Sequence, residues 1–159
     1  MRKTDEITNT MDTIDSRDII ARVEELEELR DERIEELKRF IEDPDEGGGR
    51  SYLEEYKDEL AGLEEYEESK FEMDEMKELR LLRALVEDAE QSPDWKYGET
   101  LINEAYFEKH AKDFAEDIGA TDKNYRWPCN HIVWGAAAEE LKNDYFEVDF
   151  DGVTFLIRS

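Results

Sequence analysis

Several residue types that stabilise or anchor proteins are scarce in this 159-residue chain. It contains one cysteine and three prolines, and no apolar run approaches the roughly 20 residues that a membrane-spanning helix needs. The single cysteine, Cys129, excludes an intramolecular disulfide framework and is typical of a reducing compartment. The first residues have no apolar core, so we expect no signal peptide. These absences predict a cytoplasmic protein.

Positive charge is also scarce. The chain has 21 Lys and Arg against 46 Asp and Glu, which gives a formal net charge of −25 at pH 7. Such a chain repels phosphates, so direct binding to nucleic acid or to an anionic membrane is not expected. Seven Phe, seven Tyr and three Trp nevertheless argue against disorder, because they supply apolar area that a folded core can bury.

The charge is distributed unevenly, and this predicts the domain organisation. Residues 1–90 hold 32 acids and 14 bases, whereas residues 91–159 hold 14 acids and 7 bases. We therefore predict a flexible N-terminus over 1–15, an acidic helical segment over 16–92 and a small α+β domain over 93–159.

The first half of the acidic segment predicts a helix over 17–42. Its apolar residues recur at steps of three and four from Ile19 to Ile41, which places them in one stripe along a helix. Ser16 is the expected N-cap. The pair Asp43-Pro44 ends the helix, because proline disfavours helical geometry in the residue before it.

A second helix is expected after a glycine-rich connection. Ser51 and Glu54 have the spacing of a capping box, which satisfies free N–H groups where a helix starts. Apolar residues then continue at helical spacing as far as Ala89. The apolar phase slips near Ser69-Lys70, so the continuity of this helix stays open at that point.

Together the two helices predict an antiparallel helical hairpin of the coiled-coil type. Helices of roughly 26 and 40 residues, at about 1.5 Å per residue, differ in length by about 20 Å. The surplus stripe Leu79–Ala89 therefore needs another partner. That partner is either the C-terminal domain or a second copy of the chain in a homodimer.

The C-terminal part predicts a strand, two helices and a β-hairpin. Gly98–Ile102 is the expected strand, and Asn103 can cap the helix that follows it. Residues 134–144 are rich in alanine and predict the second helix. The fold class is therefore α+β and mostly α.

The end of the chain gives the clearest local prediction. Apolar and acidic residues alternate over residues 146–150. They are followed by Asp151-Gly152, the type of two-residue turn that β-hairpins prefer. The pairing expected across this turn is Phe146 with Ile157, Val148 with Phe155 and Phe150 with Val153.

No group of residues points to catalysis or to a metal. Cys129 and His131 form a fragment of a metal site, but structural zinc needs four ligands, and His110 and the acids show no recognised ligand spacing. A Cys/His nucleophile pair also needs an orienting third group and an oxyanion site. Glycines 47–49 lack the lysine of a phosphate-binding loop. We therefore predict no enzyme activity, no metal and no cofactor.

The strongest functional signal is the recurrence of acidic pairs along both predicted helices. Residues three or four apart lie on one side of a helix, about 5–6 Å apart. The phosphates of one DNA strand follow each other at roughly 7 Å along their path. Two such acidic rows resemble a phosphate backbone, and the partner that recognises them would be basic. The sixteen candidate partner-binding residues are Glu24, Glu25, Glu27, Glu28, Asp31, Glu32, Glu35, Glu36, Glu54, Glu55, Asp58, Glu59, Glu64, Glu65, Glu67 and Glu68.

The alternative interpretation of these acids is less specific. In it the chain is a structural or adaptor coiled-coil protein that oligomerises, and its outer positions are acidic for solubility.

The C-terminal part of the sequence resembles part of a known protein family. The resemblance lies in the stretch WPCNHIVWGAAAEELKNDY, from Trp127 to Tyr145, and in the predicted strand pair Phe146–Ile157 that follows it. This part is similar to the last module of the ArdA antirestriction proteins, which has an aromatic entry, a short helix of alanines and acids, and two strands around a glycine. The wider segment Trp95–Arg158 also resembles small proteins of phages and mobile elements.

ArdA proteins are elongated acidic DNA mimics that inhibit type I restriction enzymes. The resemblance therefore implies a non-enzymatic inhibitor of a host DNA-targeting defence system, of the restriction or the CRISPR type. Such an inhibitor would act inside the bacterial host cell, on a basic nucleic-acid-binding protein or nuclease complex.

Overall fold

The protein is mixed α+β and mainly helical, as the sequence predicts. The structure, a computed structural model, describes residues 4–159, and these form five α-helices and one four-stranded antiparallel sheet. The described residues divide into two compact units. Unit 1 comprises residues 4–6 and 20–84, and unit 2 comprises residues 7–19 and 85–159. In this part of the chain no helix is long and apolar enough to cross a membrane.

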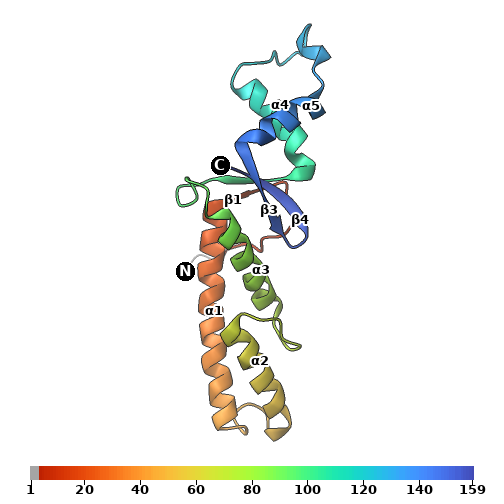
Figure 1. Ribbon diagram of the computed structural model, residues 1–159. Helices are drawn as coiled ribbons and strands as arrows, with labels where there is room; N and C mark the ends of the chain where they lie inside the picture. The colour runs from red at the N-terminus through yellow and green to blue at the C-terminus, as the bar shows by residue number, and fades with distance from the viewer. Residues whose placement is uncertain (1–3) are drawn as a thin grey trace. The chain divides into compact units, whose positions relative to one another are not determined.

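Unit 1 is built from three helices, α1 (Ser16–Glu42), α2 (Leu53–Glu65) and α3 (Asp74–Ala89) (Figure 1). The first residues of α1 and the last residues of α3 belong to unit 2. The apolar stripes predicted from the sequence supply the buried side chains of unit 1. These include Leu26, Ile34 and Leu37 of α1, Leu63 of α2, and Met76, Leu79 and Leu82 of α3.

The side chains of α1 contact those of α2 in reverse order along the chain. Arg33 pairs with Glu59, with 2.8 Å between Nε and Oε1. One turn earlier on α1, Arg30 donates from Nε to the carbonyl oxygen of Leu63 at 2.8 Å. Residue numbers therefore fall along α1 as they rise along α2, so the two helices run in opposite directions where they meet.

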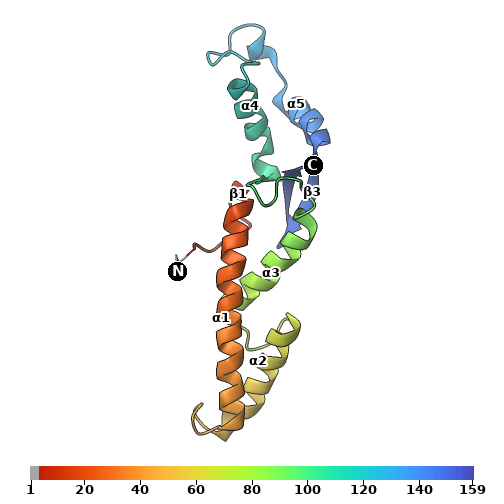
Figure 2. The ribbon, with the colours of Figure 1, turned by 90° about the vertical axis from the view of Figure 1, so that its left-hand side faces the viewer.

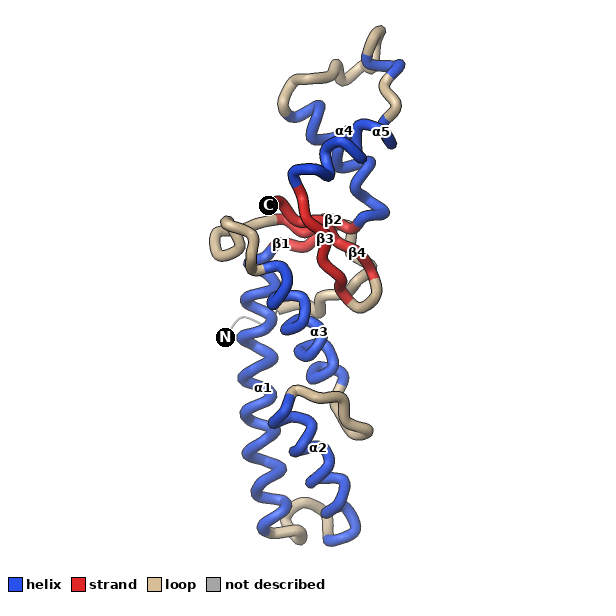
Figure 3. Tube along the Cα trace, in the orientation of Figure 1, coloured by secondary structure: helices blue, strands red, loops and turns tan. Residues whose placement is uncertain are grey.

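The second predicted helix is interrupted at residues 66–73, drawn as a loop between α2 and α3 in Figure 3. Helix α2 ends at Glu65 because Tyr66 adopts the left-handed conformation, with φ of 53°. Helix α3 then begins at Asp74. The interruption lies where the apolar phase slips at Ser69-Lys70, so the sequence signal at this point marks a real break.

Tyr66 is held on three sides at this break. Its ring lies between the guanidinium groups of Arg30 and Arg83, at 4.1 and 3.7 Å from the ring centroid. Its hydroxyl donates to the carboxylate of Glu27 at 2.8 Å, and Arg83 pairs with the same carboxylate at 2.8 Å. Each cation–π contact contributes about 0.5–1 kcal/mol at an exposed site. The end of α2 is therefore fixed by specific contacts.

Two of the predicted helix caps are wrong. Ser51 and Glu54 form no capping box, because a 3₁₀ turn (Arg50–Tyr52) precedes α2 and its start has no side-chain cap. Ser16 does begin α1, but its hydroxyl accepts a hydrogen bond from the backbone N–H of Glu99 at 2.7 Å. The serine thus connects α1 to a segment that is distant in the sequence.

Unit 2 contains the sheet, whose strand order is β1-β2-β4-β3 with every neighbouring pair antiparallel. The turn Asp151-Gly152 has positive φ at both residues, 49° and 82°, as a two-residue hairpin turn of this kind requires. The predicted hairpin pairing is confirmed in register at Phe146, Val148 and Phe150. The strand bounds are Thr13–Asp15 for β1, Thr100–Asn103 for β2, Tyr145–Phe150 for β3 and Val153–Arg158 for β4.

Strand β1 lies in the segment that the sequence predicts to be a flexible N-terminus. Ile14 of β1 is 2% exposed and is the register partner of Leu101 in β2. Asn103, at the end of β2, donates through its side-chain amide to the carbonyl oxygens of Asn9 and Met11. Residues 7–12, which precede β1, are therefore also part of unit 2.

One face of the sheet is covered by α4 (Phe107–Asp117) and α5 (Trp134–Leu141) (Figures 1 and 2). Asn103 accepts from the N–H of Ala105 at 3.0 Å, so the predicted cap forms at the 3₁₀ turn that leads into α4. The alanine-rich α5 brings Ala138 into the core. The buried residues of this cluster are Ile102, Phe107, Ala111, Ala138 and Leu156.

The stripe Leu79–Ala89, for which the sequence requires a partner, is covered within the chain. Leu79, Leu82, Leu85 and Ala89 are at most 1% exposed. These side chains therefore offer no apolar surface to a second copy.

Candidate partner-binding surface

The acids predicted as a partner-binding surface lie mostly at the surface of unit 1. Twelve of the sixteen are exposed, three are half-buried and one is buried. Glu25, Glu27 and Glu36 are the half-buried members, and Glu59 is the buried one. The twelve exposed members are Glu24, Glu28, Asp31, Glu32, Glu35, Glu54, Glu55, Asp58, Glu64, Glu65, Glu67 and Glu68.

A straight row of acids follows one side of α1. Glu24, Glu28, Asp31 and Glu35 are spaced by four, three and four residues, which places their side chains on a common line along the helix. The mean rise between them is about 5.5 Å at 1.5 Å per residue. All four are exposed. The row therefore has the near-regular spacing that the sequence predicts.

Glu59 serves the fold of unit 1. It is 4% exposed, and both of its carboxylate oxygens accept from Arg33, at 2.8 Å from Nε and 2.9 Å from Nη2. This bidentate pair raises the pKa of Arg33. A partner cannot reach the Glu59 carboxylate, so only its exposed neighbours on α2 remain candidates for partner binding. The sequence could not show this, because Glu59 differs from those neighbours only in its rotational position on α2.

A second inward ion pair joins Arg22 to Glu78. Arg22 donates from Nε and Nη2 to the two carboxylate oxygens of Glu78 at 2.7 and 2.6 Å, and these hydrogen bonds raise its pKa. Its Nη1 donates to the carbonyl oxygen of Thr4 at 3.0 Å. Both residues are buried. No spacing rule in the sequence identifies this pair, because its members are 56 positions apart.

Three arginines of α1 are turned inward while acids beside them are exposed. The side chains of Arg22, Arg30 and Arg33 are 9%, 14% and 25% exposed, whereas those of Asp31 and Glu35 are 72% and 78% exposed. Neighbouring bases would dilute the acidic rows if they shared the same surface. Arg22, Arg30 and Arg33 instead bond to groups on α2 and α3, so they do not dilute the charge of Glu24 and Glu28. Further along α1, Lys38 and Arg39 are exposed, and Lys38 lies 4.0 Å from the carboxylate of Glu35.

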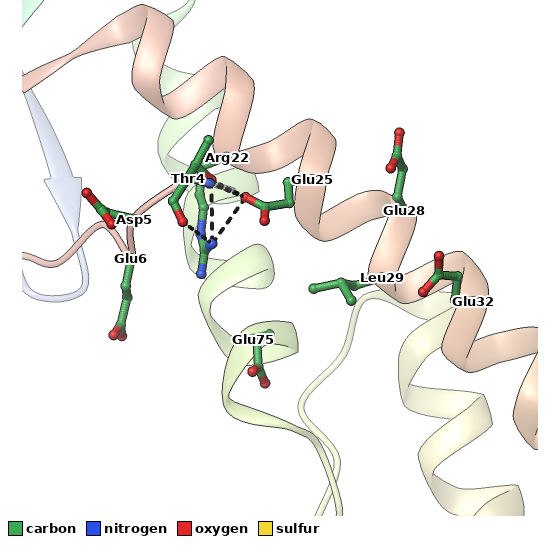
Figure 4. A pocket seen from close by; sticks show the side chains of 9 residues that line it. All are labelled: Thr4, Asp5, Glu6, Arg22, Glu25, Glu28, Leu29, Glu32 and Glu75. Carbon is green, nitrogen blue, oxygen red and sulfur yellow. Dashed lines mark hydrogen bonds and ion pairs between the residues drawn. The ribbon is translucent and has the colours of Figure 1, made fainter. Parts of the chain in front are cut away.

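A hollow of about 600 Å³ opens on the surface of unit 1 beside α1 (Figure 4). Among residues 4–159, the only cationic side chain in its lining belongs to Arg22, and that guanidinium is engaged by Glu78 and Thr4. Acids in such a concave site reinforce one another's potential and attract cations. The residues that line the hollow are Thr4, Asp5, Glu6, Arg22, Glu25, Glu28, Leu29, Glu32 and Glu75.

Glu25 stays ionised at the inner edge of this hollow. Hydrogen bonds from the hydroxyl and the backbone N–H of Thr4 lower its pKa, and the nearby Arg22 acts in the same direction. The hollow is thus suited chemically to receive the side chain of a lysine or an arginine.

Both units are acidic. Unit 1, counted over residues 1–6 and 20–84, holds 26 acids and 13 bases, a net charge of −13, and unit 2 holds 20 acids and 8 bases, a net charge of −12. About half of the charge therefore lies on unit 2, although a division of the sequence near residue 90 assigns most of it to the helices. The inward orientation of Arg22, Arg30 and Arg33 on α1, more than the net charge, distinguishes unit 1.

The other residues considered for chemistry are in unit 2. Cys129 is half-buried and His131 exposed, and both lie in a 3₁₀ turn (Cys129–His131). Within residues 4–159 no group of three or more His, Cys, Asp or Glu side chains is placed to hold a metal ion.

Comparisons with known proteins identify no relative of this chain. No family model matches it, and neither a curated protein nor a solved structure matches it at a significant level. The function is therefore argued from the residues and their arrangement.

Proposed function

We propose that this protein is a non-enzymatic inhibitor that occupies the nucleic-acid-binding surface of a DNA-targeting defence complex, of the restriction or the CRISPR type. Unit 1 presents its carboxylates to that surface in place of DNA phosphates. The partner is a basic protein in the bacterial host cell, and the interaction requires no cofactor and no metal.

The observation that carries this proposal is the separation of the charges over residues 22–35 of α1. Arg30 and Arg33 donate to α2, while Glu28, Asp31 and Glu35 on the same helix are exposed. Charges placed for solubility alone need no such sorting, because acids and bases mixed on the outer surface also keep a protein soluble. An array of one sign steers a partner of the opposite sign and is what a DNA-binding surface recognises.

The helical framework is part of the proposal. We take unit 1 to be an antiparallel helical hairpin of the coiled-coil type, which is supported by the reversed contact order of α1 and α2 and by the buried stripe along both. A stiff helix holds the carboxylates at about 5.5 Å intervals before the partner arrives. This preorganisation lowers the ordering cost of binding.

The resemblance of Trp127–Ile157 to the last module of ArdA proteins supports the class of target. The adaptor alternative has less support, because the stripe Leu79–Ala89 that would join two copies is buried.

The test begins by identifying the target. The tagged protein is used to capture partners from a bacterial lysate, and the captured proteins are identified by mass spectrometry. Purified restriction enzymes of type I and CRISPR effector complexes are then assayed for displacement of a fluorescent DNA duplex. We expect displacement by the wild-type protein, and a capture that yields no nucleic-acid-binding protein would favour the adaptor function.

A charge-reversal variant then locates the surface. Glu24, Glu28 and Glu32 are exposed and form no ion pair within residues 4–159, so changing all three to lysine leaves the internal contacts intact. We expect the variant to lose displacement activity by at least about tenfold, equivalent to roughly 1.4 kcal/mol. A control with the same change in net charge replaces three exposed acids of unit 2 by lysine, namely Glu104, Glu108 and Glu140. Equal loss of activity in both variants would mean that net charge, and not the surface of unit 1, inhibits the target.

A further inference from the structure

Strand β3 is an open edge of the sheet in unit 2. It is the last strand in the order β1-β2-β4-β3 and pairs over Tyr145–Phe150 with β4 alone. Within residues 4–159 no strand lies on its other side. At six residues it is long enough to take a further strand.

The register shows which backbone groups face this open edge. In a hairpin closed by a two-residue turn, the closing residues, here Phe150 and Val153, exchange both of their hydrogen bonds. Such hydrogen-bonded pairs recur at every second residue of the strand, so Val148 also bonds to β4. The intervening residues Glu147 and Asp149 therefore direct their N–H and C=O groups away from β4.

The same two residues make the edge acidic. Glu147 and Asp149 are both exposed, and they lie two positions apart, so their side chains project from the same face of the strand. Exposed Asp144 and Asp151 flank the strand at its two ends. An edge of this kind resists pairing with a second copy of itself, because like charges directly opposite one another destabilise a sheet.

We infer that β3 is a docking site for an extended, basic segment of a partner protein, which adds to the sheet as a fifth strand. Its main chain would pair with the outward groups of Glu147 and Asp149, and lysines or arginines at alternate positions would meet their carboxylates. Complementary charge selects this occupant over a second copy of the chain. The inference does not depend on the proposed function, because β3 belongs to unit 2 and none of its acids is among the sixteen of the helical surface.

The test uses a synthetic peptide of eight residues that alternates lysine with valine. A peptide of the same composition, with its lysines grouped at one end, is the comparison. Binding to the full chain is measured by fluorescence anisotropy, and amide hydrogen exchange is followed by NMR. We expect the alternating peptide to bind more tightly and to slow exchange of the amides of Glu147 and Asp149.

Two variants separate strand addition from simple attraction. Asp149→Pro removes an outward N–H together with the carboxylate that accepts from the N–H of Gly152 at 3.1 Å, but no hydrogen bond to β4. We expect it to weaken binding of the alternating peptide about tenfold while the sheet stays folded, and to weaken it more than Asp149→Ala, which removes the carboxylate alone. The double substitution Glu147→Lys and Asp149→Lys should weaken binding of the alternating peptide at least as much. The control pair Glu104→Lys and Glu108→Lys makes the same change in charge outside β3 and should alter binding less than about twofold.

Three results would overturn the inference. The first is equal binding of the alternating peptide to wild type and to Asp149→Pro, and the second is unchanged exchange at Glu147 and Asp149. The third is dimerisation of the free chain that Asp149→Pro abolishes, because β3 would then be occupied by a second copy. Far-ultraviolet circular dichroism confirms that each variant is folded, and the pair of lysine substitutions provides the test if the proline variant is not.

Discussion

At the scale of single residues, the acids of this chain fall into two groups that the sequence cannot separate. Glu59 and Glu78 are buried and bind arginines, whereas Glu24, Glu28 and Glu32 are exposed. Both groups occur in similar acid-rich surroundings, and only the packing of α1 against its neighbours decides which carboxylate turns inward. The sequence therefore predicts the acidic rows but not the inward members.

The buried pair of Arg33 and Glu59 gives the first prediction. Glu59→Ala leaves the Arg33 guanidinium without its bidentate partner, and we expect the free energy of unfolding to fall by about 2–3 kcal/mol. This lies below the full cost of breaking a buried pair because Arg33 is partly exposed. The measurement is urea denaturation followed by circular dichroism.

The matched control for this variant is Glu64→Ala on the same helix, where the side chain is exposed. Its effect should stay within about 0.5 kcal/mol. Similar destabilisation by both substitutions would contradict the structural role assigned to Glu59.

His110 gives a second prediction, which concerns pH. Burial lowers its pKa below 6.5, and the attraction of nearby Asp113 only partly opposes this. Its Nε2 lies 3.4 Å from the hydroxyl of Tyr145, and its ring lies beside Phe107 and Phe114. NMR titration should give an imidazole pKa below 6.5, with the resonance assigned through His131→Gln.

The lowered pKa of His110 also fixes the sign of a stability change. Between its folded pKa and 6.5 the unfolded chain binds a proton that the folded chain does not, so stability falls as the pH falls through this window. Replacement by His110→Gln should remove this contribution. An unchanged difference in unfolding free energy between pH 7 and pH 5 would contradict the assignment.

At the scale of secondary-structure elements, the sequence predicts the local features and misses the non-local ones. Helix α1 and the β3–β4 hairpin follow the predictions closely, because their apolar periodicity and their turn residues are local signals. The sequence does not predict strand β1, since the strand has three residues and pairs with β2, which lies far along the chain. It also does not decide the break after α2, because a slip in apolar phase does not show whether a helix bends or stops.

Tyr66 gives the prediction at this scale. The substitution Tyr66→Ala removes the ring from between Arg30 and Arg83, and we expect a loss of about 1–2 kcal/mol in unfolding free energy. We also expect faster amide hydrogen exchange at the end of α2 and over residues 66–73. Tyr66→Phe keeps the ring and removes only the hydrogen bond to Glu27. Its free energy of unfolding should therefore lie between those of wild type and Tyr66→Ala.

If Tyr66→Ala left amide hydrogen exchange over residues 66–73 unchanged, the Tyr66 ring would not be the group that stabilises the segment between α2 and α3. The exposed Tyr97 of unit 2 supplies a control, since Tyr97→Ala removes a ring of the same size that is 78% exposed.

At the scale of the whole molecule, the net charge of −25 arises almost equally from the two units. The units differ in what they present: unit 1 has a row of carboxylates on α1 with Arg22, Arg30 and Arg33 turned inward, and unit 2 has an acidic strand edge. We therefore propose two separate kinds of basic partner segment, a folded DNA-binding surface for unit 1 and an extended peptide for β3.

The central claim is that the helical acids replace DNA on a basic target. The most direct test is isothermal titration of the captured target with this protein, with and without saturating duplex DNA, over a series of salt concentrations. The account predicts that DNA abolishes binding and that affinity falls by at least about tenfold between 50 and 200 mM salt, because the contacts are ionic. Binding that DNA and salt leave unchanged would contradict it.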